Sequence, residues 1–242
     1  MKKVLTIAAM AALLVFVSGC KGGNRNVALT PSEKDKETVK SGDLLFVAIP
    51  ADYQLDGISD AIAQSTGSGE KNYIHTAILD VDSAGVWVLD ATIKHGVDRH
   101  PLDTFLVDFA LKDGSYPDLE VWRLNDGADA AKYVSNATAF IGEAYDFTFK
   151  ADNGTHYCTE LVYDSYVKPD GTHIFNTVPM NFALPDGTMP DYWKQLFARL
   201  GTEIPQGEPG TNPQMMRSEP SIHRVDVNIL DYSYLVPTLK QE

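Results

Sequence analysis

The first forty residues determine how much of this 242-residue chain is left to form a folded domain. Lys2 and Lys3 precede an apolar run over residues 4–17, which is typical of an export signal and too short to span a bilayer as a helix. Residues 21–40 are polar and favour a flexible tether. The remainder, about 200 residues, can bury a sizeable core. We therefore expect a signal peptide over residues 1–19, a tether over 20–40 and one folded domain over 41–242.

Cys20 is a candidate for lipid attachment. Residues 17–20 read Val-Ser-Gly-Cys, which resembles the lipobox after which bacterial lipoprotein signals are cut. The alternative is an ordinary export signal with a chance cysteine. A lipid on Cys20 would anchor the protein to a membrane of the bacterial cell envelope, which is the location we expect. It would also leave Cys158 as the one free thiol of the mature chain.

The charge of the chain excludes some partners. The formal charge is −13 at pH 7, and loss of Lys2 and Lys3 with the signal makes it −15. Such acidity argues against nucleic acid and against binding anionic lipid surfaces by charge, but it leaves neutral or zwitterionic substrates open. The sequence has no glycine-rich phosphate loop and no His, Cys and Asp cluster with metal-ligand spacing. We expect neither a cofactor nor a metal.

Strand and helix patterns are interspersed along residues 41–242, which predicts an α+β fold. The predicted strands are residues 44–49, 73–81, 86–92, 119–124 and 224–230. The predicted helices are residues 58–65, 101–111, 128–141, 157–167 and 191–200. Residues 168–190 and 205–220 are rich in Pro and Gly and are expected to be long loops.

Cys158 is the candidate nucleophile. A turn over residues 152–155 followed by an N-cap would place Cys158 in the first turn of the next helix. Unpaired backbone N–H groups and the helix dipole favour a thiolate there, and the same groups could stabilise an oxyanion. The alternative is a cysteine that packs under the helix beside Leu161 and Val162.

His75 is the candidate base. An imidazole on an otherwise apolar strand needs a hydrogen-bond partner or has a functional role. If residues 82–85 form a hairpin loop, Val81 pairs with Val86, and His75 and Asp90 become diagonal neighbours on one face. A carboxylate on one ring nitrogen leaves the other nitrogen free to take the thiol proton. A slip of one residue in the register would separate the two side chains.

The other histidines carry weaker signals. His156 falls at the predicted helix start and is expected to cap the helix or to line a pocket. The remaining four lie in loop-like stretches and are expected to be solvated: His95, His100, His173 and His223.

Four short motifs follow one another along the chain. They are Gly-Asp-Leu-Leu-Phe at 42–46, His-Thr-Ala-Ile at 75–78, Gly-Glu-Ala-Tyr-Asp-Phe at 142–147 and Tyr-Cys-Thr-Glu-Leu-Val at 157–162. Together, across roughly residues 41–230, they resemble the permuted papain-like amidases of the YaeF/YiiX group, relatives of NlpC-type cell-wall peptidases. In that group the strand with the His precedes the helix with the Cys, the reverse of papain. The resemblance implies a permuted papain-like fold with an antiparallel sheet or partial barrel.

The resemblance also implies roles for individual residues. Cys158 would be the nucleophile at the start of a packed helix, and His75 would be the base. Asp90 would be the third member of the triad, at a position where the family usually has Glu. This is a departure, because Asp is one methylene shorter.

Three further residues fall on the motifs and are expected to bind substrate: Tyr145, Tyr157 and Glu160. Tyr145 could instead be a packing aromatic, and Glu160 could support the helix.

Three functions remain in competition at this point. The first is a lipid-anchored cysteine amidase or peptidase that acts on cell-wall peptides or related amides. The second uses the same site as an acyltransferase or esterase on lipid or other acyl groups. The third is a non-catalytic binding lipoprotein that keeps the fold. The oligomeric state is open in all three.

Overall fold

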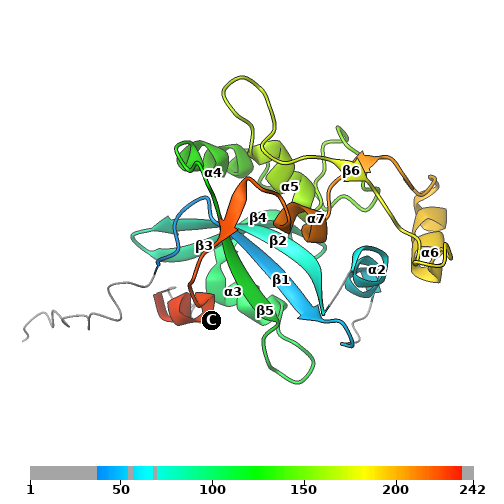
Figure 1. Cartoon of the computed structure of the whole chain (residues 1–242), viewed down its shortest axis with the longest axis horizontal. Helices are drawn as coiled ribbons and strands as arrows, with labels where there is room; N and C mark the ends of the chain where they lie inside the picture. Colours follow the sequence, from blue (N-terminus) through cyan, green and yellow to red (C-terminus); the bar gives the residue numbers. More distant parts are fainter. Residues whose placement is uncertain (1–36, 54–56, 68–69, 236–242) are drawn as a thin grey trace, which may run out of the picture. The chain divides into compact units, whose positions relative to one another are not determined.

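The computed structural model describes residues 37–53, 57–67 and 70–235 (Figure 1). The expected signal peptide, Cys20 and the tether as far as residue 36 lie outside the described residues. Within the described part, no helix is long and apolar enough to cross a membrane.

A six-stranded antiparallel sheet organises the fold, with the strand order β4-β3-β2-β1-β5-β8 (Figure 1). The predicted α+β class is therefore confirmed. The strands are β1 Leu44–Pro50, β2 Lys71–Asp82, β3 Gly85–Thr92, β4 Gly96–Pro101, β5 Asp118–Leu124 and β8 Ile222–Arg224.

In the described part of the chain, six α-helices and one 3-10 helix accompany the sheet. They are α2 Gly57–Thr66, α3 Leu102–Asp108, α4 Ala130–Thr138, α5 Cys158–Ser165, α6 Asp191–Leu200, α7 Pro213–Arg217 and the 3-10 helix η1 Ile229–Leu235. All five predicted helices are present. The third, α4, ends earlier than predicted, and the fifth prediction, residues 191–200, matches α6 residue for residue.

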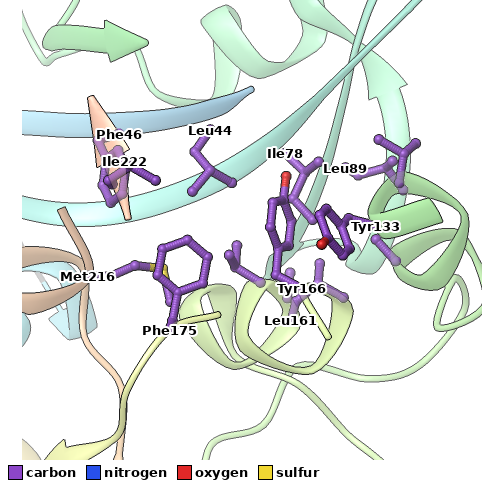
Figure 2. Close-up of a cluster of buried hydrophobic side chains, with 14 of the residues drawn as sticks. Leu44, Phe46, Ile78, Leu89, Tyr133, Leu161, Tyr166, Phe175, Met216 and Ile222 are labelled. Atoms are coloured by element: carbon purple, nitrogen blue, oxygen red, sulfur yellow. The ribbon is translucent and has the colours of Figure 1, made fainter. Parts of the chain in front are cut away.

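The central strand β1 is buried on both faces, which explains its unbroken apolar sequence. On one face, Leu44 and Phe46 belong to a cluster completed by α4, α5 and α7 (Figure 2). On the other face, Leu45 and Val47 belong to a cluster completed by α3 and η1. The sheet is therefore the middle layer of the core.

A third apolar cluster lies beside α5 and is largely aromatic. Trp193 of α6 packs edge to face against Phe149 and Phe182, with ring centroids 5.6 Å and 5.0 Å apart. The Trp193 indole N–H donates to the Ser65 hydroxyl of α2, which in turn donates to the backbone carbonyl of Phe182. This cluster packs α2, α6 and residues 180–182 against one another.

The predicted strand at residues 224–230 is wrong beyond Arg224. β8 ends there, and a 3-10 helix begins at Ile229. The Asn228 carboxamide oxygen accepts from the backbone N–H of Leu230, which is the local side-chain contact that favours a turn over a strand.

The two predicted loops also hold short elements. β6 Val178–Pro179 pairs with β7 Pro209–Gly210, and α7 follows directly. The Asn212 side chain caps α7 by accepting from Met215 N–H, and Pro213 occupies the first helical turn. The Asn-Pro pair is a helix-start signal that was overlooked in a Pro-rich stretch.

Candidate active site

Cys158 is the first residue of α5, so the prediction that it lies in a first helical turn is confirmed. Tyr157 precedes it as the N-cap in an extended conformation, with φ −95° and ψ 169°. The side chain of Cys158 is buried and is the free thiol of the described residues. Backbone N–H groups at a helix start have no intrahelical acceptor, which makes this end of α5 suited to a developing negative charge.

His75 and Asp90 meet across the β2–β3 hairpin. The observed register pairs Val81 with Val86 and Ile78 with Leu89, as the hairpin arithmetic predicts. The Nε2 atom of His75 lies 2.8 Å from the Oδ2 atom of Asp90, and both side chains are buried.

A β-bulge next to His75 sets the direction in which its side chain leaves the sheet. In the β1–β2 ladder, Val47 pairs with His75 while Ala48 pairs with Tyr73, so Ile74 is the extra residue. The ring then packs against Phe109 of the segment after α3, with centroids 4.6 Å apart. The His75 side chain is thus fixed by backbone geometry as well as by its hydrogen bond.

Cys158, at the start of α5, is the second side chain that interacts with His75. Burial by itself would lower the pKa of His75, but the negative charge of Cys158 and hydrogen bonds to Asp90 and Cys158 raise it to about 10. These interactions favour the imidazolium form of His75. Because Asp90 occupies Nε2, the other ring nitrogen, Nδ1, is the one left for Cys158.

Two pockets meet at Cys158. The first, called the aromatic pocket, encloses about 480 Å³ of empty space, part of it open to solvent; its walls include Ile62, Phe149, Tyr157, Met180, Phe182 and Trp193. The second, called the histidine pocket, encloses about 700 Å³, also partly open; its walls include Ile74, His75, Thr92, Lys94, Asp108 and Phe109. Cys158, Ile62 and Tyr145 line both.

The three predicted substrate contacts occupy different places. Tyr145 lines both pockets, and burial together with the charge of Cys158 raises its pKa well above the ordinary value. Tyr157 lines the aromatic pocket, and its hydroxyl accepts from the backbone N–H of Thr211 at 3.0 Å. Glu160 is buried and lines neither pocket; its carboxylate accepts from the Tyr157 N–H at 3.4 Å.

The prediction that His100 is solvated is wrong. His100 lies on β4, which the sequence patterns missed, and its side chain is 7% exposed. Of the other three, His95 and His223 are exposed and His173 is half-buried. His156 is buried between Glu143 and Asp164, at 2.7 Å and 3.2 Å, instead of facing either pocket.

Glu160 has an unusual charge environment. Burial and the negative charge of Asp146 raise its pKa to about 8, although His156 opposes the shift. The folded state therefore holds a proton on Glu160 that the unfolded state has lost between about pH 4.5 and pH 8. The contribution of Glu160 to folding stability therefore falls as the pH rises across that window.

Replacing Glu160 by glutamine is expected to remove this fall. The variant should be about 2 kcal/mol more stable than the parent near pH 8.5, after allowance for solvent screening of a carboxyl that is not fully buried. Near pH 4.5 the two proteins should unfold at the same urea concentration, which provides the internal control. An equal difference at both pH values would contradict the explanation by charge.

The order of these parts defines a class of protein. An antiparallel sheet carries the histidine, and a packed helix that begins with the cysteine follows it in the chain, which is the permuted papain-like arrangement. The chain belongs to the family described as permuted papain-like amidase enzyme, YaeF/YiiX, C92 family, whose model matches residues 38–226.

Two relatives are similar over most of their length. One is the uncharacterized protein YiiX of Escherichia coli strain K12, with 24% identity over 193 residues, which covers 75% of this chain and 91% of YiiX. The other is a crystal structure described as the metalloprotein yiiX of Escherichia coli O157:H7. It superposes with a TM-score of 0.59 at 24% identity and covers 77% of this chain and 96% of the other. The permuted papain-like fold is thereby confirmed.

Proposed function

We propose that this protein is a cysteine amidase of the cell envelope that cleaves peptide amides, with cell-wall peptides as the substrate class. One observation carries the proposal: the buried His75 ring interacts with both the carboxylate of Asp90 and the thiol of Cys158 where two pockets meet. Family membership supports the amide chemistry.

The proposed reaction has two halves, acylation of Cys158 and hydrolysis of the acyl-enzyme, and His75 transfers a proton in each. The Cys158 thiolate attacks the amide carbonyl, forming a C–S bond and an oxyanion that faces the N–H groups at the start of α5. His75 then gives its proton to the departing nitrogen as the C–N bond breaks. In the second half, His75 removes a proton from water, which attacks the thioester and releases the acid and the thiolate. Asp90 holds the ring throughout.

The two pockets divide the substrate between them. Since His75 protonates the leaving group, the amine part belongs in the histidine pocket, near Lys94 and Asp108. The acyl part then belongs in the aromatic pocket, whose wall includes Trp193 and Phe182. Apolar walls on the acyl side also favour the second candidate, an esterase or acyltransferase that uses the same thiol.

A metal has no place in this proposal. The similar crystal structure is described as a metalloprotein. Among residues 37–53, 57–67 and 70–235 of this chain, no group of three or more His, Cys, Asp or Glu side chains is arranged to hold a metal ion.

We further propose that a lipid on Cys20 anchors the protein to a membrane. The apolar run over residues 4–17 and the Val-Ser-Gly-Cys sequence at 17–20 support this proposal.

A substrate panel tests the proposal. The full-length mature protein in detergent is offered cell-wall peptide fragments, peptide anilides, acyl esters and acyl esters with an added amine acceptor. We expect release of free amine from the amides, lost after treatment with iodoacetamide. Cleavage that survives alkylation overturns the proposal, turnover of esters alone favours the second candidate, and binding without turnover favours the non-catalytic one.

A further inference from the structure

One oxygen of Asp90 has no hydrogen-bond partner among the residues that the structure describes. Oδ2 contacts His75, whereas Oδ1 is buried and unpaired in a side chain that is fully inaccessible. A buried carboxylate oxygen without a donor destabilises the folded state, because its hydrogen bonds to water are lost and no hydrogen bond within the protein replaces them. The free oxygen also leaves the carboxylate able to rotate away from His75.

His100 is the neighbour that could supply a donor. It lies on β4, beside the Asp98 that pairs with Asp90 across the ladder. Its Nε2 atom is 3.9 Å from Asp90 Oδ1, and its Nδ1 atom, which has no hydrogen-bond partner, is 3.5 Å from Asp98 Oδ2. The ring is buried and stacks on Phe105 of α3 at 15° between the planes.

Few other groups reach this ring. The titratable or charged side chains that face it are Asp90 of β3, Asp98 of β4 and the His95 ring at 5.8 Å. The apolar ring of Phe105 covers it from α3.

We propose that His100 is a positioning residue for the active site, donating from Nε2 to Asp90 Oδ1 so that Oδ2 stays aimed at His75. The inference rests on the proposed function, because it assigns His100 a task in holding the base. The contact must shorten by about 1 Å to become a hydrogen bond, and hydrogen bonds of catalytic groups are often long until substrate is bound. His100, Asp90, His75 and Cys158 then form one connected row.

The experiment measures how fast iodoacetamide alkylates Cys158 at about pH 6 relative to about pH 9. The proposed ion pair with His75 predicts that the thiol also reacts at the lower pH, so the ratio of the two rates is expected to be near one in the parent protein. Altered access to the thiol would change both rates and leave the ratio unchanged. The variants are His100→Phe, which keeps the stacking ring, and His100→Gln, which keeps a donor near Nε2.

His100→Phe is expected to lower the ratio about tenfold, the size of a lost hydrogen bond to a charged group, and His100→Gln should recover most of it. His95→Phe is the matched control, because His95 belongs to the same hairpin and binds Asp108 instead of Asp90. It should leave the ratio unchanged. Thermal unfolding of every variant shows which of them remain folded.

A double variant tests the route through Asp90. If His100 acts through that carboxylate, His100→Phe has no further effect in an Asp90→Asn background. An unchanged ratio in His100→Phe, or a full additional loss in the double variant, overturns the inference and leaves the proposed function standing. If His75→Ala alkylates with the same pH profile as the parent, the proposed function fails, and the inference fails with it.

Discussion

Substitution of Cys158 by alanine is expected to lower kcat/KM for the amide substrate by about 10⁴-fold or more, because the proposed acyl-enzyme forms on its thiol. The fold should survive the change. Alanine accepts the same helical position, and the side chain that is lost is small. Cys158→Ser is the companion variant, and it should be nearly as inactive because a hydroxyl is a far weaker nucleophile beside a base that pairs with a thiolate.

The same substitution should be visible without a substrate. Burial lowers the pKa of His75, and the charge of Cys158 is the largest influence that raises it to about 10. Without that charge, His75 should be neutral near pH 8, where the parent protein carries an imidazolium. Ring-nitrogen NMR shifts of His75 in the two proteins measure this directly. An imidazolium that persists in Cys158→Ala would contradict the proposed ion pair.

Replacement of His75 by alanine is the second large effect that we expect. Without the imidazolium, the thiol should behave as an ordinary one, so alkylation near pH 6 falls about a hundredfold below that near pH 9. The proposed ion pair predicts a nearly level alkylation rate over this range in the parent protein. Amide hydrolysis should fall about 10³-fold or more, because the leaving nitrogen loses its proton donor.

His223→Ala provides the control for this measurement. His223 is exposed on β8 and bonds Asn125, so its loss should alter neither the alkylation profile nor hydrolysis. A level profile in His75→Ala would rule out His75 as the partner of Cys158.

The local geometry of the site was largely predictable from the sequence. Alternating strands and a clear turn fixed the hairpin register, and that register brought His75 to Asp90. The loop before Cys158 indicated a helix start, which the structure contains. In both cases neighbours within about fifteen residues carried the signal, where periodicity is most informative.

The strand β4 and the aromatic pocket depend on contacts between distant parts of the chain and were not predicted from the sequence. The strand β4 reads Gly-Val-Asp-Arg-His-Pro, and its charged residues hide a strand at the sheet edge that pairs only with β3. The prediction that His100 is exposed to solvent was wrong for this reason. The aromatic pocket combines α2, α6 and residues 211–213, which are far apart in the chain and meet only in the folded core.

The short turn between β2 and β3 has a consequence for how such proteins can vary. Asp82 pairs with Gly85 across a tip of two residues, and His75 lies about 23 Å along the strand from that tip. A length change at the tip that shifted the register by one residue would turn Asp90 to the opposite face of the sheet. Length changes are normally harmless in exposed hairpin tips, but such a change here would separate Asp90 from His75. The length of this surface turn therefore matters to the candidate site although none of its residues lines either pocket.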